Sequence, residues 1–289
     1  MKKVIKLEPQ GFCGGVRNAL NIAYKTLEND STLKPIYLLG NLIHNSFVIK
    51  DLNEKGIITI DEKGKTRLEL LDLIDRGTVI FSAHGVEPKV YQKAKIKGLN
   101  IVDATCPYVK KVHDNIESYL KNNYEIIYIG KLNHPECEGI LGISNKIHLV
   151  NEIDDIDKLN ISNNLIYVTN QTTLSIFDIE IFYNKIKSIY PNAIIDDKIC
   201  NATTVRQKTI MEQETVDLAI VIGDPKSSNT NKLYHVSKDI RGLDTIFGSS
   251  LDELDKEKIK KANSISITSG ASTPSFLVDE VIEYIKGLE

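Results

Sequence analysis

This chain contains an internal repeat, in which a cysteine occupies the same position in each of three similar segments. The spacing is 93 residues from Cys13 to Cys106 and 94 residues from Cys106 to Cys200. Each cysteine follows a run typical of a β-strand and precedes a segment whose apolar spacing favours an α-helix, more weakly after Cys200. These strand-like runs are residues 4–7, 101–103 and 193–195. With 289 residues, this period predicts three similar units of roughly 100 residues each.

Polar residues recur at the ends of two further strand-like runs in every unit. One run ends at a glycine, and a polar side chain follows four positions later: His44, His134 or Ser227. The other run ends in a polar loop, at residues 82–85, 169–173 and 268–274. Ligands of open parallel sheets bind beyond the carboxyl ends of the strands, where helix N-termini also point. Three such edges that face one centre would form one shared pocket.

Short β-type runs alternate with helical segments along the whole chain, a pattern typical of α/β proteins. We therefore expect three pseudo-repeated α/β domains with mainly parallel sheets. Their expected boundaries are residues 1–104, 105–198 and 199–289, and each domain carries one of the repeated cysteines. Because no Gly/Ser-rich linker separates them, we expect the units to pack tightly.

Charge and hydropathy narrow the class of protein. The formal net charge of −3 argues against a nucleic-acid partner and against an anionic membrane surface, since both favour a basic excess. The basic N-terminus has no apolar stretch behind it that would make a signal peptide, and no run approaches the ~18 apolar residues of a membrane span. We expect a cytoplasmic protein, in which structural disulfides are disfavoured.

The repeated cysteines have three interpretations. A buried cysteine is often a small apolar residue, but packing gives no reason for a thiol at one loop position in three repeats. Structural zinc sites use four ligands, commonly in close C-x₂-C pairs, which this chain lacks. A cubane [4Fe–4S] cluster normally takes four cysteines, so Cys13, Cys106 and Cys200 would leave one iron open. This third interpretation suits the count best, and Cys137, out of register, is interpreted as a packing residue.

The strand-end loops also supply hydrogen-bond donors without a large fixed charge. Taken singly, each is an ordinary cap or loop residue, but residues 223–229 are more informative, because their hydroxyls and amide can start a helix and cradle a phosphate. The nucleotide-binding patterns G-x-x-x-x-G-K-[ST] and G-x-G-x-x-G do not occur. The loop donors are His44, His84, His134, Thr172, Thr173, Ser227, Ser228, Asn229 and Ser272.

Eight motifs, in order along essentially the whole chain, resemble one known family, the LytB-type 4-hydroxy-3-methylbut-2-enyl diphosphate reductases of the non-mevalonate isoprenoid pathway. The motifs are GFCGGV at 11–16, IHN at 43–45, FSAHG at 81–85, DATCP at 103–107, HPE at 134–136, QTTLS at 171–175, SSN at 227–229 and GAS at 270–272.

The resemblance implies a trefoil of three α/β domains around one [4Fe–4S] cluster, held by Cys13, Cys106 and Cys200 with its fourth iron open. It implies that His134, Glu136 and Thr172 lie nearest the substrate hydroxyl as catalytic residues, with Thr173 adjacent. The residues that it assigns to the diphosphate are His44, His84, Ser227, Ser228, Asn229 and Ser272.

The implied reaction is the removal of an allylic hydroxyl with two electrons and two protons, which gives isopentenyl and dimethylallyl diphosphates. Glu136 is the candidate acid that turns the leaving hydroxyl into water. An external donor such as ferredoxin or flavodoxin is implied, because the chain has no flavin or nicotinamide motif. Two alternatives stay open: an iron–sulfur dehydratase that resembles quinolinate synthase, and a non-enzymatic iron–sulfur redox sensor.

Overall fold

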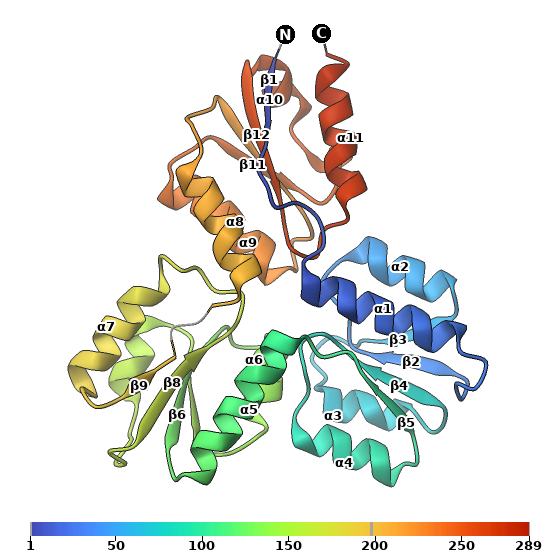
Figure 1. Cartoon of the computed structure of the whole chain (residues 1–289), viewed down its shortest axis with the longest axis vertical. Helices are drawn as coiled ribbons and strands as arrows, with labels where there is room; N and C mark the ends of the chain where they lie inside the picture. Colours follow the sequence, from blue (N-terminus) through green and yellow to red (C-terminus); the bar gives the residue numbers. More distant parts are fainter. Residues whose placement is uncertain (1, 197–198, 289) are drawn as a thin grey trace.

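The protein is described from a computed structural model, which covers residues 2–196 and 199–288. Three parallel sheets with their helices form three lobes around a common centre (Figure 1). The predicted α/β class, with three similar units arranged as a trefoil, is confirmed. No helix among the described residues has the length and apolar character needed to cross a membrane.

The first unit contains a four-stranded sheet in the order β3-β2-β4-β5. Leu38 belongs to the same apolar cluster as Ala19 on one face of the sheet, whereas Leu39 clusters with Val90 on the other, because successive strand residues point to opposite faces. The strands are β2 (Ile36–Leu39), β3 (Ile57–Ile60), β4 (Thr78–Phe81) and β5 (Asn100–Asp103). The helices are α1 (Gly14–Glu28), α2 (Ser46–Glu54), α3 (Arg67–Leu70), the 3₁₀ turn η1 (Leu71–Leu73) and α4 (Pro88–Ile96).

The second unit repeats this plan with the order β7-β6-β8-β9. The central pair, β6 and β8, is buried on both faces, as is typical of parallel strands covered by helices on both sides. The strands are β6 (Glu125–Ile129), β7 (Ile147–Val150), β8 (Ile166–Asn170) and β9 (Ile194–Ile195). The helical segments are α5 (Pro107–Lys121), α6 (Pro135–Leu141), η2 (Ile153–Lys158) and α7 (Ile179–Ile189).

The third unit has the order β11-β10-β12-β1, so its fourth strand comes from the other end of the chain. The strands are β10 (Leu218–Ile222), β11 (Thr245–Gly248), β12 (Ser264–Ser269) and β1 (Lys3–Lys6). The helical segments are α8 (Asn201–Glu212), α9 (Ser228–His235), the π-helical turn η3 (Val236–Ile240), η4 (Leu251–Glu253), α10 (Lys256–Lys261) and α11 (Ser275–Lys286).

The position of β1 corrects the expected extent of the first unit, residues 1–104. β1 pairs with β12, with Lys3 opposite Ser264 and Lys6 opposite Ile267. It fills the edge that β5 and β9 fill in the other two sheets, so the N-terminal strand closes the third unit. Each repeated cysteine therefore lies where the chain leaves one sheet and enters the first helix of the next unit. The expected boundary at residue 198 lies outside the described residues.

Candidate active site

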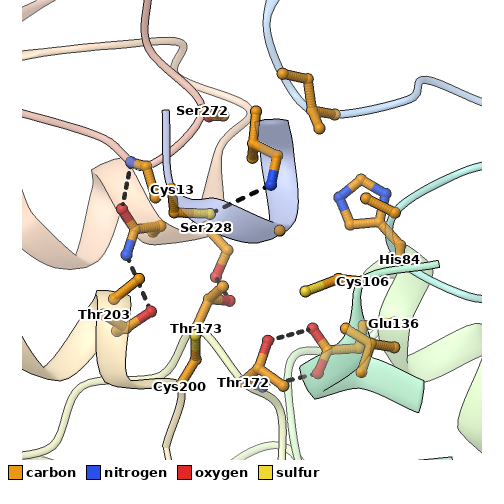
Figure 2. Close-up of a pocket in the computed structure, with 18 of the residues that line it drawn as sticks. Cys13, His84, Cys106, Glu136, Thr172, Thr173, Cys200, Thr203, Ser228 and Ser272 are labelled. Atoms are coloured by element: carbon orange, nitrogen blue, oxygen red, sulfur yellow. Dashed lines mark hydrogen bonds between the residues drawn. The ribbon is translucent and has the colours of Figure 1, made fainter. Parts of the chain in front are cut away.

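The three units meet around one cavity that opens to solvent, with about 710 Å³ of space not filled by atoms when the open solvent is included. Every residue that the sequence assigned to the site lines this cavity, on loops and helix N-termini from all three units. Figure 2 shows the sulfur atoms of Cys13, Cys106 and Cys200 turned toward the same space. The remaining lining residues are Gly15, Val16, Ile43, Ala83, Tyr108, Val109, Ala202, Thr203 and Ala271.

The repeated cysteines are held in the same way in each unit. Each is the N-cap of a helix, with Cys13 before α1, Cys106 before α5 and Cys200 before α8. Their backbone N–H groups donate to carbonyls of the loops after β12, β4 and β8, at N···O distances of 3.0, 3.0 and 3.3 Å. The repeat in the sequence thus becomes an approximate threefold arrangement of thiols.

Three helix N-termini converge on these thiols, since α1, α5 and α8 begin near the centre and run outward (Figure 1). Cys13 Sγ accepts a hydrogen bond from the Val16 N–H at 3.4 Å. Burial raises the pKa of the Cys106 and Cys200 thiols, and the N–H groups that follow each of them in the chain oppose this rise. The N-terminal ends of helices carry partial positive charge, so they offset part of the cost of burying anionic sulfur at these positions.

The three thiols line the same cavity, but they do not close on a single metal ion. Among the residues that the structure describes, no group of three or more His, Cys, Asp or Glu side chains can hold a single ion, which disfavours zinc. A Cβ atom added to Gly15 would overlap Cys106 Sγ and lie 3.8 Å from Cys13 Sγ, so the absence of a side chain keeps this space open. The cysteines form no disulfide. Three free, separated thiols fit a multi-iron cluster.

Cys137 lies away from this constellation. It is 1% exposed on α6 and packs in an apolar cluster with Tyr128 and Ile140. Its Sγ lies 3.9 Å from Gln171 Oε1, and burial raises the pKa of its thiol. The side chain fills a core position and does not line the cavity.

Three histidines form one side of the cavity. The ring centroids of His44 and His84 are 4.6 Å apart, and His134 lies 5.6 and 5.7 Å from these two. Burial lowers the pKa of all three rings, that of His134 to about 3, and Arg67 lowers them further. They are therefore neutral at pH 7 unless an anion joins them.

Two features make these rings available to a ligand. Both ring nitrogens of His44 are buried without a hydrogen-bond partner among the described residues. His134 Nδ1 accepts from the Glu136 N–H at 3.1 Å as the N-cap of α6. Because Nδ1 is an acceptor there, the proton of the neutral His134 ring is on Nε2, where it can be donated.

Glu136 is the carboxyl group of the cavity, and it is only 1% exposed. Its Oε1 accepts from the Thr172 N–H at 2.7 Å, and its Oε2 accepts from Thr172 Oγ1 at 3.0 Å (Figure 2). Burial raises the pKa of Glu136 to about 7, although the two bonds from Thr172 oppose the rise. At neutral pH this carboxyl is poised between its acid and base forms.

The hydroxyl-rich loop lies at the N-terminus of α9, where Ser227 is the N-cap. Ser272 Oγ lies 3.3 Å from Ser227 Oγ and donates to the His44 carbonyl at 3.2 Å. Thr173 Oγ1 donates to Ser228 Oγ at 2.8 Å. The loop therefore joins all three units through hydroxyl groups, which can exchange these bonds for a ligand.

The side chain of Asn229 makes more hydrogen bonds within the protein than the sequence indicated. Its Nδ2 donates to Thr203 Oγ1 at 3.2 Å, and its Oδ1 accepts from the Ala271 N–H at 2.9 Å. One amide hydrogen thus remains for a ligand. Thr203 escaped the sequence analysis, although the repeat pointed to it, since it follows Cys200 by the three positions that separate Val16 from Cys13.

Comparisons with known proteins agree with this geometry. A family model described as LytB protein matches residues 4–286. The chain is 46% identical to the 4-hydroxy-3-methylbut-2-enyl diphosphate reductases of Anoxybacillus flavithermus and Geobacillus kaustophilus, over 98% of this chain and 90% of each relative. Its fold matches the Plasmodium falciparum E-1-hydroxy-2-methyl-but-2-enyl-4-diphosphate reductase with a TM-score of 0.88 and 34% identity, over 98% of this chain and 87% of that one.

A second solved structure is similar over 99% of this chain and all of the other, with a TM-score of 0.68 and 30% identity. It is described as (E)-4-hydroxy-3-methyl-but-2-enyl diphosphate reductase, the terminal enzyme of the non-mevalonate pathway.

Proposed function

This chain belongs to the LytB family, and we propose that its central cavity reduces 4-hydroxy-3-methylbut-2-enyl diphosphate. The reaction consumes two electrons and two protons, breaks the allylic C–O bond and releases water with isopentenyl or dimethylallyl diphosphate. It is the last step of the non-mevalonate isoprenoid pathway. The observation that carries the assignment is that three N-capping thiols, one buried carboxyl and a ring of neutral donors share one cavity.

The test is anaerobic turnover of the allylic diphosphate with a chemical reductant, by protein reconstituted with iron and sulfide. We expect both isoprenoid diphosphates as products. Cluster-dependent dehydration without net reduction would favour the quinolinate-synthase-like alternative. A protein that binds a cluster and changes its redox state, yet turns over neither kind of substrate, would favour a sensor.

Cys13, Cys106 and Cys200 would hold the [4Fe–4S] cluster, because they are the thiols that reach the shared space. When bound, the cluster supplies electrons and, at the iron without a protein ligand, a Lewis acid. The converging helix N-termini stabilise the negative charge of the thiolates.

The diphosphate would bind on the side of α9, where Ser227, Ser228 and Ser272 offer hydroxyls and the helix offers N–H groups. No lysine or arginine lines the described cavity, so neutral donors and the imidazoles carry this role. An anion near His44 and His84 raises their pKa, and binding is then accompanied by proton uptake.

Protons for the leaving hydroxyl would come from the pair of Glu136 and Thr172, with His134 beside them. The Thr172 hydroxyl donates to Glu136 Oε2 and so connects the buried acid to the cavity. His134 Nε2 carries a proton that can orient the substrate oxygen. In this assignment Glu136 supplies the proton, Thr172 relays it and His134 positions the substrate.

Gly15 tests whether the space between the thiols is used. Gly15→Ala places a methyl group against Cys106 Sγ, so we expect lower iron content and lower turnover than in the unchanged protein. Gly14→Ala is the matched control, because a Cβ at Gly14 has nothing within 4 Å. Iron and acid-labile sulfide per chain are measured after anaerobic reconstitution. Equal cluster content in the two variants would contradict the proposed location.

The electron donor would be a small acidic redox protein such as ferredoxin or flavodoxin, in the cytoplasm. The chain is acidic overall, with a net charge of −3, yet the exposed charges near the starts of α1, α5 and α8 are mostly basic. The exposed acidic exceptions are Glu8, ahead of α1, and Asp103 and Asp114, on either side of the start of α5. The basic residues are Arg17, Lys110, Lys111 and Lys208. Their charge and the three helix N-termini make this face attractive to an acidic partner close to the cluster site.

Charge reversal tests this docking face. The double variant Lys110→Glu, Lys111→Glu should raise the KM for a reduced acidic donor about tenfold at low ionic strength. At high salt, the KM values of the variant and the unchanged protein should become similar, because salt screens the charges. Turnover with dithionite should not change, because a small reductant needs no docking face. Lys260→Glu on α10, in the outer part of the third unit, is the control. An unchanged KM in the double variant would place the donor elsewhere.

A further inference from the structure

Arg206 on α8 is a buried cation outside the cavity lining, and no step above uses it. It is 3% exposed. Its guanidinium donates to the carbonyl oxygens of Gly11 at 2.7 Å and Ala202 at 3.1 Å. Its Nε–H has no acceptor, and no carboxylate pairs with it, among residues 2–196 and 199–288. A buried charge without an ionic partner is costly, so a compensating negative charge is expected close by.

Two of the repeated cysteines would supply this charge once they bind metal as thiolates. Burial lowers the pKa of Arg206, and the charges that oppose this lowering most are those of Cys13 and Cys200, ahead of Glu8. Arg206 lies on the helix that begins after Cys200, and its bond to Gly11 fixes the segment that leads to Cys13. The Arg206 side chain thus contacts the two backbone segments that carry Cys13 and Cys200, two of the proposed cluster ligands.

We propose that Arg206 is the internal counter-charge of the cluster site, which raises the reduction potential of the bound cluster and positions the Cys13 segment. The proposal rests on the proposed function. A fixed positive charge in a low-dielectric site stabilises the more negative, reduced state of the cluster. The same negative charge offsets the burial of the guanidinium, which explains why an arginine without a carboxylate partner is tolerated here.

The experiment is a redox titration of the reconstituted protein, followed by electron paramagnetic resonance. Arg206→Gln removes the charge, so at the midpoint potential of the unchanged protein we expect the ratio of reduced to oxidised cluster to fall at least tenfold, equivalent to 59 mV for one electron. Arg206→Lys keeps the charge and should restore most of the ratio. A purely structural role predicts equal effects of Gln and Lys, and that result overturns the proposal.

Gln207→Leu is the matched control. Gln207 is fully buried on the same helix and holds the Leu174 carbonyl and the Ile176 N–H through an uncharged amide, so its loss should lower stability and leave the potential unchanged. A shift in this variant equal to that of Arg206→Gln also overturns the proposal.

If Arg206→Gln binds too little cluster for a redox titration, the retention of iron is measured instead. In the presence of a chelator, the unchanged protein should retain the most iron, the Lys variant less and the Gln variant the least. If both the Gln and the Lys variant lose the cluster but keep native circular dichroism spectra, the role of Arg206 is limited to its hydrogen bond with Gly11. That result overturns the proposal that Arg206 is a counter-charge. An unchanged protein that takes up no cluster overturns both proposals, whereas one that holds a cluster without turnover overturns the proposed function alone.

Discussion

Replacing Cys13, Cys106 or Cys200 with serine should remove most of the bound iron and abolish turnover. Each sulfur would be a direct ligand, and a serine hydroxyl is a poor substitute because it is not deprotonated at neutral pH and matches iron less well than thiolate. Loss of an outer-sphere partner already costs about 10–100-fold in metal sites, so the loss of a ligand should exceed that range. Iron content, sulfide content and anaerobic turnover are measured on the same preparations.

Cys137→Ser is the control that makes this prediction specific. Its thiol is buried in the core of the second unit, where Gln171 Oε1 can accept a hydrogen bond from the new hydroxyl. We expect about four iron per chain, as in the unchanged protein, and a loss of stability of about 1 kcal/mol. If Cys137→Ser loses iron as fully as the other three variants, the cluster has four protein ligands and no open iron.

The repeat in the sequence was sufficient to predict the three units and the meeting of Cys13, Cys106 and Cys200. This succeeded because the spacing of cysteines, strands and glycines is local information that each unit carries independently. The pairing of β1 with β12 was missed because strand partners distant in the sequence leave no local signal. The pattern placed the strand correctly and assigned it to the wrong sheet.

Burial and partner choice were the parts of the site that the sequence did not reveal. Asn229 was predicted as a phosphate donor from its loop, and its bonds to Thr203 and Ala271 became visible only after the third unit was folded. Arg206 has the sequence environment of an ordinary helix surface, because composition does not report whether a charge is buried. The Glu136–Thr172 contact joins residues 36 positions apart, on α6 and on the loop after β8, which lie together only once the sheet has formed.

Glu136→Gln should lower turnover by about 10²–10⁴ while iron content and substrate affinity change little. The amide keeps the shape of the carboxyl and cannot donate a proton to the leaving hydroxyl. The competing structural role is the link between α6 and the loop after β8, whose loss would cost ~1 kcal/mol and leave turnover nearly normal. Glu138→Gln on the same helix is the control, because Glu138 pairs with Arg67 and does not line the cavity.

The pH dependence separates the two roles of Glu136. Burial raises its pKa from an ordinary value of 4.5 to about 7, so the acid form is present below pH 7 and is lost above it. Turnover that depends on this proton should fall as the pH rises through about 7, and the Gln variant should lack that inflection.

Stability should follow the same titration. Because the pKa of Glu136 is raised in the folded state, its contribution is complete below about pH 4.5 and is lost as the pH rises through about 7. The difference in unfolding temperature between the Gln variant and the unchanged protein should therefore shift in favour of the variant from pH 5 to pH 8. A Gln variant with near-native turnover and an unchanged pH profile would remove Glu136 from proton delivery and leave Thr172 or a water molecule to supply the proton.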